Sequence, residues 1–354
     1  MSVELERVKD WWAKDLPQYR SRYNYDTIVL KVIPDPTLAY EKWLKGEIDV
    51  QEFKRVDVYA LKVKGTDKDK IGDKPGSGKP VWAGAFPTSG NYGWYGIAWN
   101  QKYAPLADLK VRQALAQLVD YKSCIDRFWF GYAKRAVTPF GSSGPNVDPD
   151  IKAGKGLYTY DPKKALTTLQ QDGWKDSDGS GVLSKMIDGK NVKLKIDIQY
   201  FTGSHAAEQV LQMLKENGKK AGVEINIRPT EGSALFNNFD AREFQGLFIG
   251  WGGGSIYPDP RQIWHSDSQN GGSNKVGYSN KQVDVLIDEA NYEFDRKKRA
   301  KTLQKIGKIL YQEQPYLFVI ERNTILQGVR DGIKSPTWGQ KYGTSPPTDL
   351  FYTP

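Results

Sequence analysis

The residues best suited to binding a ligand lie in a glycine-rich segment that follows an apolar run. The run Leu247–Trp251 is expected to form a buried strand, and it leads into GWGGGSIYPDP at residues 250–260. Glycines at a strand terminus let a ligand's backbone approach closely because they carry no side chain. Trp251 and Tyr257 would flank such a ligand. A glycine-rich loop with packed aromatic side chains explains the segment equally well, so the residues alone leave both interpretations open.

Recognisable catalytic motifs are missing from the rest of the chain. Segment 75–79 (PGSGK) resembles a phosphate-binding loop, but Asp73 replaces its first glycine and Pro80 replaces the hydroxyl residue that would hold magnesium. No G-x-S-x-G nucleophile motif occurs. The two histidines, His205 and His265, have no partner motif for nucleophilic catalysis or zinc binding. We therefore expect no catalytic residue, no metal and no cofactor.

Segment 176–181 (DSDGSG) resembles the start of a calcium-binding loop. The last ligand position of such a loop would be Ile187, whereas calcium requires a bidentate glutamate there. Aspartate and glycine are also common turn residues, and we interpret this segment as a turn between a helix and a strand. The single cysteine, Cys124, excludes a disulfide within the chain.

The length and composition indicate a folded chain with more than one hydrophobic core. The 354 residues exceed what one core usually supports, and 39% hydrophobic with 26% charged residues is typical of globular proteins. The net charge of +9 comes from dispersed lysines interleaved with acids, which argues against a nucleic-acid partner because such surfaces cluster their cations. No apolar run is long enough to span a bilayer. Residues 2–10 are charged, so no signal peptide is visible in this chain.

Strand-like and helix-like segments alternate along the chain, which indicates an α/β fold. Apolar and polar residues alternate through 192–200, as in a strand with one buried face. Asp161-Pro162 opens a helical pattern that ends at Gly173, with a capping residue, a first-turn proline and a terminal glycine. Further strands are expected at 27–33, 48–50, 95–99, 223–227, 247–251 and 316–320.

Several short motifs occur in the order found in a known family. They are residues 10–17 (DWWAKDLP), 22–26 (RYNYD), 45–49 (KGEID), 99–100 (WN), 111–115 (VRQAL), 119–120 (VD), 161–174, 250–251 with 257–260 (YPDP), Asn274, 277–280 (GYSN), 283–284 (VD), Arg299 and Pro315. Together they resemble the extracellular solute-binding proteins of family 5, which serve ABC importers of peptides and related solutes. The tryptophan-rich opening is most similar to the oligopeptide and microcin-type branch.

This resemblance implies a two-lobed, periplasmic-binding-protein-like fold of type II, with mixed sheets flanked by helices. Residues 1–95 would be part of the first lobe, 96–325 the second lobe as a continuous insert, and 326–354 the return to the first lobe. The N-terminal portion of the first lobe, with its export signal, has no counterpart, so an upstream segment or another chain is expected to supply it. The full-length protein would lie in the periplasm or at the cell surface and deliver its solute to an ABC permease.

The resemblance also implies where a ligand binds. The lobes would close by hinge motion, and the segment from Trp251 to Tyr257 would pair with an extended ligand by strand addition. The expected ligand-binding residues are Trp99, Asn100, Tyr200, His205, Trp251, Gly252, Gly253, Tyr257 and Asp259. Peptide-binding relatives carry an aspartate where Ile256 stands, so a free α-ammonium group is not expected to be required. A carbohydrate-active enzyme with a carboxylate pair and aromatic platforms is the alternative.

Overall fold

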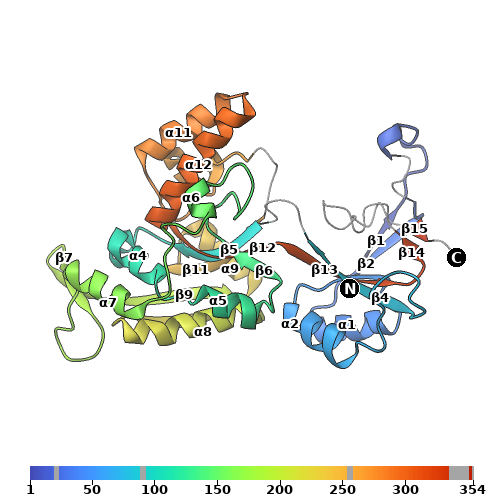
Figure 1. Ribbon diagram of the computed structural model, residues 1–354, viewed down its shortest axis with the longest axis horizontal. Helices are drawn as coiled ribbons and strands as arrows, with labels where there is room; N and C mark the ends of the chain where they lie inside the picture. Colours follow the sequence, from blue (N-terminus) through green and yellow to red (C-terminus); the bar gives the residue numbers. More distant parts are fainter. Residues whose placement is uncertain (20–23, 88–92, 253–257, 335–350, 353–354) are drawn as a thin grey trace. The chain divides into compact units, whose positions relative to one another are not determined.

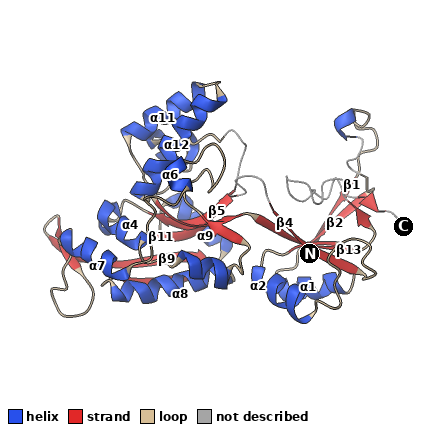
Figure 2. Ribbon diagram, in the orientation of Figure 1, coloured by secondary structure: helices blue, strands red, loops and turns tan. Residues whose placement is uncertain are grey.

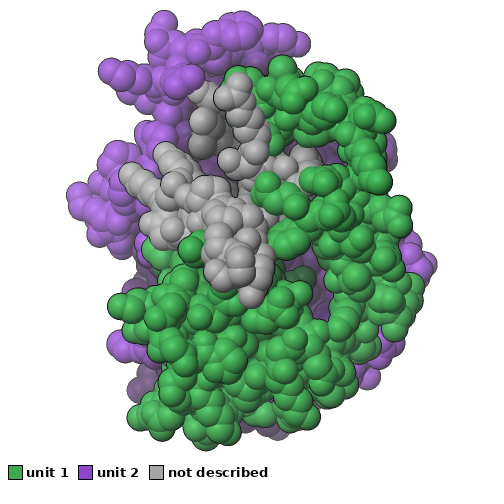
Figure 3. Space-filling model, turned by 90° about the vertical axis from the view of Figure 1, so that its right-hand side faces the viewer, with its two compact units in different colours: residues 1–89, 323–354 green, residues 90–322 purple. Residues whose placement is uncertain are grey.

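A computed structural model describes residues 1–19, 24–87, 93–252, 258–334 and 351–352. The chain forms two compact units, unit 1 from residues 1–89 with 323–354 and unit 2 from residues 90–322 (Figure 3). The boundaries expected at 95/96 and 325/326 would fall inside strands β5 (Gly93–Trp99) and β13 (Thr324–Arg330). The structure instead divides the chain just before each of these strands, which keeps each strand whole within one unit.

Unit 2 is built on a six-stranded mixed sheet in the order β10-β9-β11-β5-β12-β6. Strands β10, β9 and β11 are parallel, whereas β5, β12 and β6 each run antiparallel to the strand before them in that order. The strand bounds beyond β5 are β6 Ala133–Arg135, β9 Lys195–Phe201, β10 Glu224–Thr230, β11 Gly246–Gly252 and β12 Tyr316–Arg322. Figure 2 shows the sheet with helices on both faces.

The single strand expected over 192–200 is two strands in two sheets. β8 (Lys190–Lys193) pairs with β7 (Ser184–Ile187) in a separate hairpin, and β9 begins only after Leu194. A tight turn at Asp188 and Gly189, both with positive φ, joins the hairpin strands. Leu194, the residue between β8 and β9, is fully buried and holds the chain where it passes from one sheet to the other. The alternation continued through the break because Val192 and the buried Leu194 keep the two-residue spacing of β9, so periodicity could not reveal it.

Helices cover both faces of the unit 2 sheet, with α11 and α12 on one side and α8 on the other (Figure 1). The aromatic residues Trp94, Trp264, Tyr316 and Phe318 form the centre of the core under α11 and α12. Regular helices are α3 Ala104–Ala107, α4 Leu109–Ala116, α5 Tyr121–Ser123, α6 Pro149–Lys152, α7 Pro162–Gln171, α8 His205–Lys220, α9 Gly232–Ala241, α10 Arg261–Trp264, α11 Lys281–Tyr292 and α12 Arg296–Glu313. A π-helical turn spans Cys124–Phe128 and a 3-10 turn spans Ser266–Gln269.

Side-chain caps explain where several of these helices begin. Asp108, Asp161, Asn280 and Asp295 accept hydrogen bonds from the first backbone N–H groups of α4, α7, α11 and α12, respectively. These N–H groups have no partner inside the helix, so each cap stabilises its helix start by about 1 kcal/mol. The predicted helix after Asp161-Pro162 is confirmed, and Gly173 takes the positive φ of +92° that favours glycine there.

Among the described residues, unit 1 contains three small sheets and one longer helix. β1 (Ser2–Glu6) pairs antiparallel with β2 (Thr27–Lys31), and β13 pairs antiparallel with both β3 (Val50–Glu52) and β4 (Val81–Pro87). Helix α1 (Pro36–Leu44) buries Tyr40 and Trp43, whereas Leu38 is 46% exposed. Other elements are the turns at Pro17–Tyr19, α2 Val56–Val58 and Tyr59–Thr66, and the short pair β14 Ile333–Lys334 with β15 Phe351–Tyr352.

Candidate functional site

One edge of the unit 2 sheet collects the features expected of a ligand site, and we call it the site edge. It consists of the carboxyl ends of β9, β10, β11 and β12 and the amino end of β5, because β5 runs antiparallel to β11 and β12. Ligands of α/β proteins commonly bind outside the carboxyl ends of strands. Both connections of the chain to unit 1 also leave from this edge, before β5 and after β12. The glycine-rich segment therefore begins at the same sheet edge from which the chain passes to unit 1.

Trp251 lies at the site edge with its ring partly in the core. It stands opposite Trp94 in the β11–β5 pair, and its ring packs edge-on against Phe239 at 6.1 Å and Tyr316 at 6.5 Å. Trp94 is 2% exposed and stacks on Trp264, with ring centroids 6.3 Å apart. Trp251 itself is only partly buried. Core contacts therefore fix the orientation of the Trp251 indole, and part of its ring surface remains exposed at the site edge.

Tyr316 lies under Trp251 and is fully buried. Burial raises the pKa of its hydroxyl, because removing a charged phenolate from water is costly, and the nearby Trp251 indole opposes this rise. The two groups are close without forming a well-aligned hydrogen bond. Tyr316 is therefore neutral over the physiological range and acts as packing beneath Trp251.

Of the two glycines that flank Trp251, only Gly252 has room for a side chain. A Cβ on Gly250 would approach the Tyr95 ring to 2.5 Å, whereas a Cβ on Gly252 would meet nothing within 4 Å. Beyond Gly246 and Leu247, β11 makes no further ladder pairs with β9, so Phe248–Gly252 has one strand edge without a strand partner among the described residues. An exposed strand edge can pair with an extended peptide.

Trp99 and Asn100 lie at the opposite end of β5 from the site edge. Trp99 is fully buried and pairs with Gly246, where a Cβ would approach its ring to 2.8 Å. Asn100 is 1% exposed, and its amide donates to the backbone oxygens of Arg242 at 3.0 Å and Phe244 at 2.9 Å. Both side chains therefore hold the loop before β11, and we leave them out of the candidate site.

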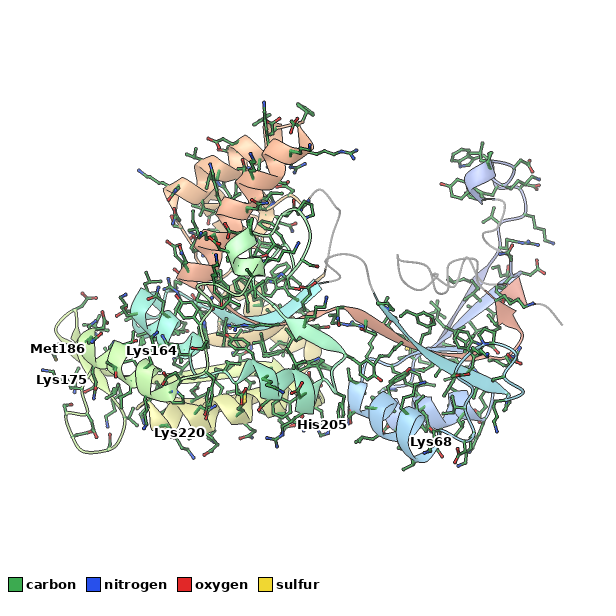
Figure 4. All side chains as sticks on the ribbon, viewed as in Figure 1. Lys68, Lys164, Lys175, Met186, His205 and Lys220 are labelled. Carbon is green, nitrogen blue, oxygen red and sulfur yellow. The ribbon has the colours of Figure 1, made fainter. Side chains whose placement is uncertain are left out.

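Tyr200 and His205 lie near the site edge but belong to the α8 face of the sheet. Tyr200 is 5% exposed, and burial, with a contribution from the Glu208 carboxylate on α8, raises its pKa. His205 is exposed at the first turn of α8, and Figure 4 shows it at the opposite end of that helix from Lys220. It lines a shallow depression of about 640 Å³ that also includes Asp120 and Arg127. Trp251 lies on the other face, so these two residues do not join it in one pocket.

The remaining predicted residues are in or after the glycine-rich segment. Gly253 and Tyr257, like Ile256, lie outside the described residues. Asp259 is exposed and accepts hydrogen bonds from the Arg261 backbone N–H at 2.9 Å and the Asn291 amide at 3.1 Å. Its observed contacts fix the turn before α10.

Sequence reasoning missed one residue at the site edge, Glu321. It is the next-to-last residue of β12, is 3% exposed, and pairs in register with Trp94. The signal available in the sequence was a charged residue at the end of the apolar run 316–320, but charges commonly mark a strand's exit into solvent.

The described residues offer little for catalysis or metal binding. They contain no group of three or more His, Cys, Asp or Glu side chains placed to hold a metal ion. Cys124 is buried, and burial raises the pKa of its thiol to about 12, which leaves almost none as the nucleophilic thiolate near neutral pH. Within the same described portion, every helix is too short or too polar to cross a bilayer.

Comparison with solved structures first defines the class. The structure of the oligopeptide-binding protein AppA from Bacillus subtilis, in complex with a nonapeptide, superposes with a TM-score of 0.80 at 25% identity, covering 100% of this chain and 64% of that one. The fold is thus that of the two-lobed, α/β periplasmic-binding-protein class.

The sequence comparisons then define the family. Residues 1–274 match the family described as bacterial extracellular solute-binding proteins, family 5 Middle. The chain belongs to this family, and the resemblance seen in the sequence motifs is confirmed. It is 31% identical to AppA over 323 residues, which is 91% of this chain and 54% of the relative. It is 25% identical to heme-binding protein A of Haemophilus influenzae, over 87% of this chain and 52% of the relative. The chain thus spans about half the length of the curated relatives it matches.

Proposed function

We propose that this chain is a substantial part of the substrate-binding component of an ABC importer, which captures a peptide-like or related solute. The observation that carries this proposal is the site edge, where a partly exposed Trp251 sits between Gly250 and Gly252 on a strand whose end has one edge without a partner in the part of the chain that the structure describes. The aromatic ring offers a large rigid contact, and the unpaired strand offers backbone hydrogen bonds. Together they suit an extended ligand whose backbone adds to β11.

The protein binds its solute without chemical change. Family membership supports this, because family 5 is described as extracellular solute-binding proteins. Glycoside hydrolysis, the alternative from sequence, requires two carboxylates flanking one bond. The strand register places one carboxylate, Glu321, opposite the same β5 residue as Trp251, and the relatives compared above are named as binding proteins. The test is whether the purified protein retains and releases an unchanged solute.

The protein works outside the cytoplasm, in the periplasm or at the cell surface, and hands its solute to an ABC permease. Units 1 and 2 correspond to the first and second lobes, which close over the ligand by hinge motion at the connections before β5 and after β12. Its partners are the solute and the permease, and nucleic acid is not among them.

Unit 1 needs a further polypeptide segment to complete its sheet. A cavity of about 760 Å³ is lined by β2 and by β3, and each strand has a single ladder partner among the described residues. A residue in a sheet occupies roughly 160 Å³, given about 3.3 Å of rise, about 4.8 Å between strands and about 10 Å of thickness. The cavity is thus the size of about five strand residues. A strand inserted there would pair with both edges, and it comes from an upstream segment or a separate chain.

A further inference from the structure

Two phenylalanine side chains of unit 2 lie outside its core. Phe201, the last residue of β9, is 49% exposed, and Phe236 on α9 is 60% exposed. Neither belongs to the cluster of buried residues that forms the centre of the unit. A single exposed apolar residue is common on a protein surface, whereas apolar residues that gather in one place indicate a binding surface. The neighbours of Phe201 and Phe236 therefore decide which case applies.

Phe201 points to the same face of the sheet as Trp251. The preceding residue, Tyr200, belongs to the α8 face, and successive residues of a strand alternate between the two faces. A Cβ placed on Gly232, the first residue of α9, would lie 3.0 Å from the Phe201 ring. Phe201 therefore packs against the first turn of α9, the helix whose Phe239 contacts Trp251.

Phe236 lies between these two contacts along α9. Gly232, Phe236 and Phe239 follow one another at spacings of four and three residues, so they share one stripe of the helix. Phe201 packs at the first of these positions and Trp251 at the last. With about 1.5 Å of rise per residue, the stripe is roughly 10 Å long. Phe201, Phe236 and Trp251 therefore form a row of aromatic side chains at the site edge, which we call the aromatic row.

An extended ligand on the free edge of β11 would meet the aromatic row. One edge of β11 pairs with β5 along the whole strand, and the ladder with β9 ends at Leu247. The edge of 248–252 that lacks a described strand partner is therefore the one on the β9 side, the side of Phe201. Side chains of an extended chain alternate between the two faces of a sheet, so every second side chain of a ligand paired there would face α9.

We propose that the aromatic row is a subsite that selects peptide-like solutes carrying a large apolar or aromatic side chain. This inference rests on the proposed function, and it names the ligand chemistry of that same site. A ligand side chain that covers Phe201 and Phe236 removes apolar surface of both partners from water, which favours binding. An aromatic ligand side chain gains further from edge-on or offset stacking with the rings of the row. A small side chain gains neither.

The test compares two alanine-rich peptides with blocked termini that are identical except for phenylalanine or alanine at the central position. Binding to the full chain is measured by calorimetry for the wild type, Phe201→Ala, Phe236→Ala and Phe294→Ala. Phe294 is 94% exposed between α11 and α12 and serves as the matched control. The wild type should prefer the phenylalanine peptide by about tenfold or more, the gain expected from burying such a side chain.

Phe201→Ala and Phe236→Ala should each reduce this preference by at least about threefold while still binding the alanine peptide, and Phe294→Ala should keep it. Both substituted side chains are largely exposed, and a thermal melt of each sample checks that the fold is kept. Equal binding of the two peptides by the wild type, or an unchanged preference in both row variants, overturns the subsite and leaves the proposed function standing. Binding of neither peptide by the wild type contradicts peptide capture, and the inference falls with it.

Discussion

Trp251 belongs to the core and to the surface at the same time. Contacts with Phe239 and Tyr316 fix its ring, and the absence of a side chain at Gly252 leaves the opposite face of the strand end open. A rigid, partly exposed aromatic side chain loses little conformational entropy on binding, so it suits a ligand anchor.

Trp251→Ala should weaken solute binding by roughly 1–3 kcal/mol, because a binding anchor of large contact area is lost. Calorimetric titration measures the change, and a thermal melt of the same sample separates it from loss of folding. Trp12→Ala is a suitable control, since Trp12 is 84% exposed in unit 1. Unchanged affinity in a folded Trp251→Ala protein would assign the side chain to the core alone.

Acetylation of a peptide ligand's N-terminus should leave its affinity unchanged within about twofold. The family resemblance places an acidic residue at the position of Ile256, and an apolar side chain cannot compensate a desolvated ammonium group, so that charge should add nothing to the affinity. The measurement is a paired titration of free and acetylated forms of one peptide. A large loss on acetylation would show that a carboxylate, with Asp259 as the first candidate, binds the α-ammonium group.

At the scale of elements, the sequence correctly predicted the helices and strands whose signals lie within one short segment. The cap, proline and glycine around α7 lie within one short segment, and so does the apolar run of β11. The roles of Trp99 and Glu321 depend on antiparallel pairing between distant strands, which decides that Trp99 is far from Trp251 and Glu321 is near it. No local pattern carries that information, so one residue was misplaced and the other missed.

The position of β5 at the centre of the unit 2 sheet gives a test of how that unit folds. A fragment of residues 90–322 should fold cooperatively by itself, because the six strands and their covering helices lie within it. A fragment of residues 96–322 lacks Trp94 and should be less stable by about 3–5 kcal/mol, the usual cost of losing a large buried aromatic side chain. Urea unfolding of both fragments measures the difference, and equal stabilities would contradict the central role assigned to β5.

At the scale of the whole molecule, the two units differ in how much apolar surface their described residues bury. Unit 2 has a continuous core, whereas unit 1 has small separate sheets whose exposed apolar residues include Val29 and Leu30 on β2. Unpaired strand edges with apolar side chains tend to aggregate or to capture another strand.

Adding the strand segment proposed for unit 1, either fused to the chain or as a separate polypeptide, should raise the melting temperature and tighten solute binding. A hinged receptor holds its ligand from both lobes, so a strand that completes the sheets of unit 1 should strengthen that hold. Thermal melts and titrations of the chain with and without the added segment measure both effects. If the chain alone is monomeric, equally stable and binds as tightly, then no complementing segment is needed.

The central claim, solute capture without turnover, is tested most directly by native mass spectrometry of the protein purified from its own host. The account predicts a noncovalent adduct of peptide-like mass that is released intact on mild activation and rebinds with the same mass after long incubation. Conversion of the released solute to a product on incubation, abolished by substitution of one carboxylate at the site edge such as Glu321→Gln, would contradict it.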